Sequence, residues 1–482
     1  MKPKLFLRAD GNAQTGLGHL YRVLALAEAC NIFFDCLFLV KDSAELASEI
    51  VGNSGKVIEL YNDLDSGTDP FLQIGVHDII VLDGYHFTTD FQQAVQSNYH
   101  CKLVCIDDIH SFSFVSDVVI NPAGGISDKQ YSAPSTTSFL LGPRYAMLRH
   151  YFYTVDKSQR NFNSIENVLI CFGGADPGNE TLNILKYVQN IHPGIKISVV
   201  VGSAYQHINS LKNYCADQKS VCIHYALDGE AMVKLMQECD TAVCSASTIC
   251  YEFSSVTGLL FLKQTATNQA GIYQFMINES LALPFDKFED IYRSNEIRQI
   301  QTEQKKKQEI YFDGKAGKRL LKALKKLYLR DNIVFRSAEP ADVDLYYRWA
   351  NDMTVRNSSF NTELIGYDEH CGWFSTNLSS TNAVLYVATT TTQIPAGSIR
   401  FKIKDDIAEL SYLVDPLFRG AGLGEIILRE GVAKLMNERK EVKVVEGLVK
   451  YTNIASLKAF EAAGYRMLPD KDPKIFRFQL KR

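Results

Sequence analysis

Short apolar runs alternate with stretches of helical periodicity over the first 150 residues of the chain. The runs predict strands at 4–8, 33–40, 78–83, 102–107 and 117–120. Between the first two, apolar side chains recur with the period of a helix, at Leu20, Val23, Leu24, Leu26 and Ala27. Strands that alternate with helices in this way are typical of a parallel sheet.

The same alternation begins again near residue 165 and stops near 330. Strands are predicted at 168–172, 197–201 and 241–244, and the apolar spacing in the Lys- and Gln-rich stretch 300–330 predicts an amphipathic helix that closes this half. Beyond 330, a strand at 333–336 leads into a helix, and strands follow at 384–388, 397–403 and 407–414. We therefore expect three domains, at 1–155, 156–328 and 330–482.

A glycine-rich turn, Gly16-Leu17-Gly18-His19, separates the first predicted strand from the first helix. Free backbone N–H groups at such a helix start favour a phosphate. His19 would lie in the first helical turn, where the helix dipole opposes protonation and leaves a neutral imidazole able to act as a base. Arg22 shares its helix face and could hold a phosphate. The alternative is a tight turn with a structural histidine.

Polar residues follow several other predicted strands. Asp83-Gly84-Tyr85 and Asp107-Asp108 end two strands of the first half, and Gly173-Gly174 and Ser245-Ala246-Ser247-Thr248 end two of the second. Open α/β sheets bind ligands at this edge, so a ligand is expected in the cleft between the halves. For each of these groups considered alone, the alternative is that it only forms an ordinary turn or caps a helix.

Composition narrows the classes of function. The net charge is −4 and no basic tract is present, which argues against nucleic-acid binding. No apolar run is long enough to span a membrane and no signal peptide is evident, so we expect a cytoplasmic protein. The eleven cysteines lack the paired spacing of a zinc site, and no metal is expected.

The C-terminal domain carries V-x-P-x-x-R-G-x-G-x-G at 414–424 and N-x-x-S-x-x-x-F-x-x-x-G-Y at 453–465. Together they resemble the GNAT acetyltransferases, which implies acetyl-CoA as co-substrate. The cofactor residues implied are Leu413, Val414, Arg419, Gly420, Gly422, Gly424 and Asn453. Phe460 departs from the tyrosine that protonates the CoA thiolate in many of these enzymes. Tyr451, Tyr465, a water or a stabilised thiolate could replace it, and the base could be Glu409 or a water chain.

The first 280 residues resemble the UDP-sugar hydrolase of the pseudaminic acid pathway, a relative of glycosyltransferases with the GT-B fold. The matching residues include Arg8-x-Asp10, Gly18-His19-x-x-Arg22, Asp83-x-Tyr85, Gly173-Gly174-x-Asp176 and Asn268-Gln269. The resemblance implies two Rossmann-type α/β halves, a catalytic His19 and a sugar site lined by Tyr85. Asp10 would orient His19 or bind the sugar. The substrate-binding residues implied are Gly16, Gly18, Arg22, Asp107, Gly173, Gly174, Ser247, Glu252, Asn268 and Gln269.

The two resemblances together predict a bifunctional enzyme that acts on UDP-amino-sugars. The GNAT domain would acetylate the 4-amine of a UDP-4-amino-sugar, and the first part would then hydrolyse the diacetamido product to free sugar and UDP. The alternatives are a GT-B glycosyltransferase, or a nucleotide-sugar binding module fused to a protein N-acetyltransferase. The stereochemistry of the sugar, the oligomeric state and direct transfer of product between the sites do not follow from the sequence.

Overall fold

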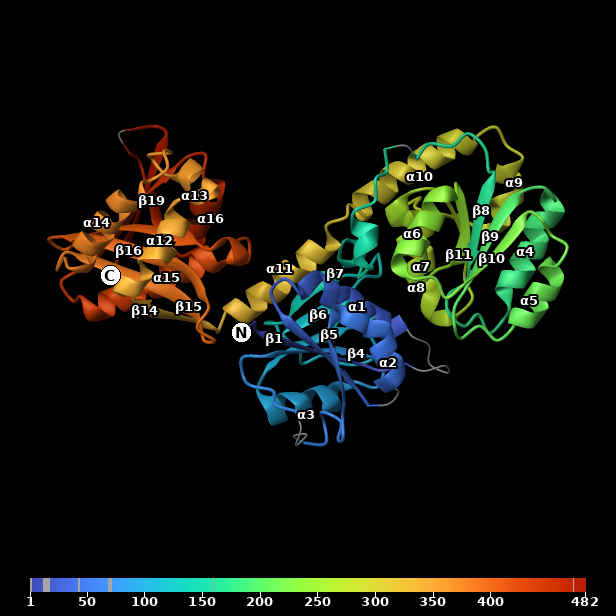
Figure 1. Cartoon of the computed structure of the whole chain (residues 1–482), viewed down its shortest axis with the longest axis horizontal. Helices are drawn as coiled ribbons and strands as arrows, with labels where there is room; N and C mark the ends of the chain where they lie inside the picture. The colour runs from blue at the N-terminus through green and yellow to red at the C-terminus, as the bar shows by residue number, and fades with distance from the viewer. Residues whose placement is uncertain (1, 12–17, 42–43, 68–71, 159, 471) are drawn as a thin grey trace. The chain divides into compact units, whose positions relative to one another are not determined.

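The computed structural model describes residues 2–482 except 12–17, 42–43, 68–71, 159 and 471. It contains three sheets (Figure 1) and divides into two compact units. Lys4–Leu321 form the first unit, with two of the sheets, and Lys322–Arg482 belong to the second.

The first sheet has seven parallel strands in the order β3-β2-β1-β4-β5-β6-β7. Its central strands are apolar on both faces because helices cover them, as in β4, where every residue is buried. The strands are β1 Lys4–Ala9, β2 Asp35–Val40, β3 Lys56–Glu59, β4 Ile79–Asp83, β5 Lys102–Ile106, β6 Val118–Asn121 and β7 Ser138–Leu141. The helices are α1 Gly18–Cys30, α2 Ala44–Val51 and α3 Thr89–Tyr99, with 3₁₀ turns η1 Gly52–Ser54, η2 Asp128–Gln130, η3 Pro143–Tyr145 and η4 His150–Tyr153.

The second sheet is also parallel, in the order β10-β9-β8-β11-β12-β13. Its strands are β8 Asn167–Cys171, β9 Lys196–Val201, β10 Val221–Tyr225, β11 Thr241–Ser245, β12 Leu259–Lys263 and β13 Leu283–Pro284. The accompanying helices are α4 Glu180–Ile191, α5 Ile208–Cys215, α6 Gly229–Glu238, α7 Thr248–Val256, α8 Ala270–Asn278 and α9 Phe288–Tyr292, with η5 Thr267–Gln269 and η6 Phe285–Lys287. Two Rossmann-type halves are therefore present, as expected.

Residues 300–330 form two helices instead of the one predicted. α10 (Ile297–Tyr311) and α11 (Ala316–Leu329) are separated by a short turn (Figure 1). Gly314 has φ +73° there, and a Cβ at this position would lie 2.6 Å from the Tyr153 carbonyl oxygen. The close approach of two backbones and the positive φ both require glycine, and they end the first helix.

The third sheet is antiparallel except for one parallel pair, β17 with β18, in the order β14-β15-β16-β17-β18-β20-β19. The strands are β14 Ile333–Ser337, β15 Ala383–Thr390, β16 Pro395–Lys404, β17 Ile407–Val414, β18 Val444–Lys450, β19 Arg466–Leu468 and β20 Ile475–Lys481. The helices are α12 Val343–Ala350, α13 Met353–Ser358, α14 Tyr367–Leu378, α15 Leu423–Glu438 and α16 Ile454–Ala462, with η7 Pro340–Asp342 and η8 Pro416–Phe418.

Alternation along β16 separates the two faces of this sheet. Ile399 and Phe401 are buried, and a Cβ at Gly431 of α15 would lie 2.9 Å from Ile399, so α15 covers this face. Arg400 and Lys402 point to the opposite face and are exposed. There α12 and α14 pack on the sheet through an apolar cluster that includes Trp349, Phe374, Leu385 and Val387, with Leu413 of β17 packed against it. Lys402, Lys404, Glu409 and Ser411 are exposed on the rest of that face, which is open and polar.

Candidate functional sites

His19 is held at the start of α1 by a buried carboxylate. Its Nδ1 lies 2.7 Å from Oδ1 of Asp83, which ends β4 and is fully buried. Arg22, one turn along α1, donates to both Asp83 oxygens, at 2.5 and 2.9 Å. Burial would raise the pKa of Asp83, but the Arg22 and His19 interactions outweigh it and lower that pKa. Arg22 Nη2 also lies 2.9 Å from His19 Nδ1. Because an ionised Asp83 only accepts and its contact with Nδ1 is the shorter one, we infer that the proton lies on Nδ1 and that Nε2 is left as the basic nitrogen.

Asp108 extends this cluster toward the second half of the unit. It accepts from Arg22 Nη1 at 2.9 Å and from the Tyr85 hydroxyl at 3.3 Å. The Tyr85 ring meets the His19 ring edge-on, with centroids 5.0 Å apart. Burial and then Asp108 raise the pKa of Tyr85, and a hydrogen bond with Asn268 partly offsets the rise. Tyr85, from the first half, and Asn268, from the second, are thus brought together.

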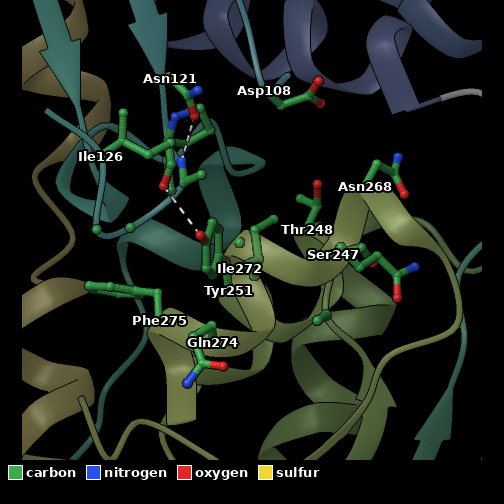
Figure 2. Close-up of a pocket in the computed structure, with 18 of the residues that line it drawn as sticks. Asp108, Asn121, Ile126, Ser247, Thr248, Tyr251, Asn268, Ile272, Gln274 and Phe275 are labelled. Atoms are coloured by element: carbon green, nitrogen blue, oxygen red, sulfur yellow. Dashed lines mark hydrogen bonds between the residues drawn. The ribbon is translucent and has the colours of Figure 1, made fainter. Parts of the chain in front are cut away.

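A pocket of about 750 Å³ adjoins this cluster. Asp108 reaches it from the first half, and Ser247, Thr248 and Asn268 line its other side (Figure 2). Its remaining walls are more apolar, with Ile126, Tyr251, Ile272 and Phe275 among them. His19 lines a small recess that shares Arg22, Asp108 and Ile109 with this pocket. A pocket of this size next to the recess of His19 can hold a small polar ligand close to a base.

The two predicted acidic residues Asp10 and Asp107 both have partners within the protein. Asp10 pairs with the buried Arg8 at 2.6 Å and accepts from the Lys41 backbone N–H, while the His19 ring is oriented by Asp83. Asp107 points inward and accepts from the His110 N–H and the Tyr131 hydroxyl. Its carboxylate supports the loop after β5, and Asp107 also lines the small recess that contains His19. Its contact with the substrate stays a prediction, and Asp108 lines both the recess and the larger pocket.

The residues predicted to hold the nucleotide fall into two groups. Ser247 is the N-cap residue of α7. Both Ser247 and Gln269 line the pocket. Gly173, Gly174 and Glu252 lie outside the described pocket lining. Glu252 is buried and accepts from Arg149 at 2.9 and 3.1 Å; burial raises its pKa although Arg149 lowers it. Gly18 is the first residue of α1, and Gly16 lies outside the described residues.

In the second unit, β17 and β18 part halfway along their length. Their parallel ladder ends at the pair Leu410 and Gly447. Beyond it, the backbone of Leu413 and Val414 has no ladder partner in β18. Arg419 folds back on this strand end, where it donates to the Val414 carbonyl at 3.1 Å and pairs with Asp352 at 2.6 Å. An extended ligand could lie in this opening along an unpaired strand edge.

A glycine turn leads from β17 into α15. Gly420 and Gly422 have φ values of +78° and +84°, which side chains rarely adopt. Gly424 is helical, and a Cβ there would lie 3.3 Å from Ala459 and from the Tyr412 ring. The turn presents free N–H groups at a helix start, the geometry that suits a pyrophosphate. Asn453 caps α16 and accepts from the Ser456 N–H at 3.1 Å.

Phe460 is a packing residue. It is buried and stacks on Phe478, with centroids 4.8 Å apart. Of the two tyrosines proposed in its place, Tyr465 is buried and Tyr451 is half exposed. A pair of hydroxyl groups lies beside the glycine turn: Tyr412 Oη is 3.1 Å from Ser456 Oγ and 3.4 Å from the position of a Cβ at Gly424.

Sequence reasoning quoted Asp83, Asp108 and Ser456 within motifs but assigned them no role, and it missed Arg149 and Tyr412. The signal for Asp83 and Asp108 was available, since both follow parallel strands at the edge where α/β sheets bind ligands. Tyr412 lies on the strand just before the glycine turn, with no local signal of its own. Among the described residues, no group of three metal-ligating side chains occurs, and none of the described helices is long and apolar enough to cross a membrane.

Comparison with known proteins identifies the two parts separately. The family model of the acetyltransferase (GNAT) domain matches residues 332–466. The chain is similar to the UDP-2,4-diacetamido-2,4,6-trideoxy-beta-L-altropyranose hydrolase of Campylobacter jejuni, 25% identical over 259 residues, which is 52% of this chain and 87% of that protein. An uncharacterized protein of Methanocaldococcus jannaschii is 24% identical over 486 residues, 96% of either chain.

Among solved structures, that of spermidine N-acetyltransferase from Vibrio cholerae with CoA and spermine covers 32% of this chain and 96% of its own, at 12% identity and a TM-score of 0.29. The match to the GNAT family model supports the assignment of the C-terminal domain, and the similarity to the Campylobacter hydrolase supports that of the N-terminal part. The chain joins an N-terminal part homologous to a UDP-sugar hydrolase to a C-terminal acetyltransferase domain of the GNAT family.

Proposed function

We propose that the chain is a cytoplasmic, bifunctional enzyme of nonulosonic acid biosynthesis, of the pseudaminic acid type. Its N-terminal part hydrolyses UDP-2,4-diacetamido-2,4,6-trideoxy-beta-L-altropyranose to the free sugar and UDP. Its GNAT domain transfers the acetyl group of acetyl-CoA to the 4-amine of the UDP-4-amino-sugar precursor. The similarity to the Campylobacter hydrolase supports the first activity, and the GNAT family match supports the second. None of the eleven cysteines, all of which lie in the described residues, forms a disulfide.

Hydrolysis would proceed by attack of water on the anomeric carbon. His19 Nε2 takes the water proton, the new C–O bond forms, and the bond from the anomeric carbon to the diphosphate oxygen breaks, with UDP leaving as the anion. Asp83 stabilises the resulting imidazolium, since it already accepts from Nδ1. The leaving diphosphate would meet Ser247, Thr248 and the backbone N–H groups at the start of α7.

The observation that carries the hydrolase is the His19–Asp83 pair beside the pocket, and substitution of His19 tests it. His19→Asn in the full chain should lower the rate of UDP release by about 10²–10⁴-fold, the usual contribution of a general base. The substrate is the diacetamido UDP-sugar, and UDP is measured without any acceptor, which separates hydrolysis from glycosyl transfer. Acetyl transfer by the same sample should be unchanged and reports that the protein is folded. Hydrolysis by the variant within a few-fold of wild type would exclude His19 as the base.

Acetyl transfer would use the opening between β17 and β18. The pyrophosphate of acetyl-CoA would bind the turn of Gly420, Gly422 and Gly424, with Leu413 and Val414 along the thioester arm and Arg419 and Asn453 beside it. The substrate amine attacks the thioester carbon, and the C–S bond breaks. Phe460 cannot protonate the leaving thiolate, whereas the Tyr412–Ser456 hydroxyl pair lies beside Gly424 and could. Glu409 is exposed on β17 and stays a candidate base.

A further inference from the structure

The open face of the third sheet carries an arginine beside the point where β17 and β18 part. Arg400 on β16 is the cross-strand partner of Ser411 on β17. Ser411 is the first residue beyond the last ladder pair between β17 and β18. Neighbouring strands lie about 4.8 Å apart, so Arg400 is one strand from the opening in which acetyl transfer is proposed.

The Arg400 guanidinium stacks on a tryptophan. The group lies over the Trp373 ring of α14, 4.9 Å from its centroid, while the residue as a whole is exposed. Stacking occupies the flat face of a guanidinium and leaves its N–H edge to donate in the plane. The side chain is therefore oriented without its donors being used up by the stack.

Two more cations are held near the same place by neutral oxygens. Arg356 of α13 is buried and donates to the carbonyls of Ala350 and Glu363 and to the Ser359 hydroxyl. Lys450, at the end of β18, donates to the Ser359 carbonyl. Desolvation lowers the pKa of Arg400 and the charge of Arg356 lowers it further, while Tyr346 and Glu409 raise it. Arg356 is thus close enough to Arg400 for the two charges to repel.

No ion pair within the described residues joins Arg356, Arg400 or Lys450 to a carboxylate. Arg477, on the far side of the opening, differs: it pairs with Glu446 at 2.9 Å and Asp470 at 3.1 Å. Arg356 and Lys450 share the neutral residue Ser359, whereas Arg400 stacks on Trp373, and Glu409 is the carboxylate whose charge acts on Arg400. The three cations outnumber this carboxylate, so the local potential is positive, which attracts an anion and repels a polyamine.

We propose that Arg400, in the field of Arg356 and Lys450, binds the diphosphate of the acetyl acceptor, so that the acceptor is a nucleotide sugar. The proposal rests on the acetyltransferase function proposed above and adds the feature by which that domain recognises its acceptor. An arginine edge donates two parallel hydrogen bonds to a phosphate, which a lysine cannot do. The sugar carrying the amine would then extend from Arg400 across Ser411 toward the opening.

The test compares two acceptors in the full chain, with CoA release as the readout. One acceptor is a UDP-4-amino-4,6-dideoxy-sugar, and the other is the same amino sugar without its nucleotide. Arg400→Ala should raise the KM for the UDP-sugar by about 10–100-fold, the effect of one charge-assisted hydrogen bond, and Arg400→Lys should do so less. The KM for the free amino sugar and for acetyl-CoA should not change. UDP should inhibit wild type competitively with the UDP-sugar and inhibit Arg400→Ala weakly.

Lys404→Ala is the matched control, because Lys404 is exposed on the same strand and the same face, four residues away. All variants share the N-terminal part, so a difference between them reports the acetyltransferase domain. Equal KM values for Arg400→Ala and Lys404→Ala, or a wild type that prefers the free amino sugar, a polyamine or a peptide, would overturn the proposal and leave the acetyltransferase standing. If no amino sugar is acetylated, with or without its nucleotide, the proposed function fails, and this proposal with it.

Discussion

At the scale of single residues, the proposed hydrolysis depends on which nitrogen of His19 carries the proton. Asp83 fixes this by accepting from Nδ1. Asp83→Asn replaces an obligate acceptor by an amide whose N–H can donate to Nδ1, which moves the imidazole proton to Nε2 and removes the base. We expect UDP release to fall by about 10²–10⁴-fold with little change in KM. The ¹⁵N spectrum of the imidazole should show the change of tautomer.

Asp108→Asn is the control for this substitution, because it also removes a carboxylate from Arg22 but leaves the His19 contact intact. Its effect on kcat should be the smaller of the two. A proton that stays on Nδ1 in Asp83→Asn, or equal losses in the two variants, would contradict the positioning role.

The pKa of Asp83 is lower in the folded protein than in the unfolded chain, where it is about 3.9. The ion pairs of Asp83 therefore stabilise the fold fully above that unfolded pKa, and this stabilisation is lost as the pH falls through the folded pKa. Loss of hydrolysis between about pH 5 and 7 would therefore report another group.

The sequence predicted His19 and Arg22 as a pair because three residues along a helix bring side chains to one face. It named Asp10 as a residue that would orient His19 or bind the sugar and gave Asp83 no role, although both lie at the same sheet edge, and in the structure Asp10 pairs with Arg8. Asp107 and Asp108 pose the same difficulty: adjacent residues after a strand point in opposite directions, and the loop decides which one faces the pocket.

At the scale of elements, the turn from β17 into α15 depends on glycine for two different reasons. A side chain at Gly422 meets open space but is strained by the positive φ, whereas one at Gly424 would press on Tyr412 and Ala459. Gly422→Val should therefore raise the KM for acetyl-CoA about tenfold or more, the effect of about 1–2 kcal/mol of strain on the N–H groups of the turn. Gly424→Val should also lower kcat if the Tyr412–Ser456 pair protonates the thiolate. Acetylation kinetics at varied acetyl-CoA measure both.

Gly52→Val is the matched control, since Gly52 also has a positive φ (+52°) and open space but belongs to the other unit. It should leave the KM for acetyl-CoA unchanged, and hydrolysis of the diacetamido UDP-sugar should survive in all three variants. Simultaneous loss of both reactions in the two turn variants would indicate damage to the fold instead of to the cofactor site.

Long periodic elements were predictable and short or interrupted ones were not. Most predicted strands of the two parallel sheets are apolar runs, which periodicity detects. The strands β3, β7, β10 and β13 were missed, and they are only partly buried or exposed. β12 was missed although it is a buried apolar run. The break between α10 and α11 was missed because its cause is a close approach of Gly314 to the Tyr153 backbone, a tertiary contact.

At the scale of the whole molecule, the division between the two compact units falls inside α11, after Leu321, whereas the sequence predicts a domain boundary at about 330. The second half of this helix belongs to the acetyltransferase unit. Lys325 donates to the Leu417 carbonyl at 2.7 Å, and Leu324 and Tyr328 are buried at 0% and 1% exposure. A sequence pattern shows that a helix is amphipathic but not which of two cores its apolar side chains enter.

The position of a cut therefore matters for separating the two activities. Fragments 1–321 and 322–482 should each fold and keep their own reaction, because each retains its own core. A fragment that begins at residue 330 loses Leu324 and Tyr328 from its core, at roughly 1.5–3 kcal/mol for each large buried apolar side chain. Its melting temperature should fall by roughly 10 °C relative to that of 322–482, since about 1 kcal/mol shifts a domain of this size by 2–4 °C. Calorimetry of the two fragments measures the difference, and equal melting temperatures would show that α11 contributes nothing to the acetyltransferase unit. Loss of UDP release in soluble, folded 1–321 would show instead that hydrolysis requires the acetyltransferase unit.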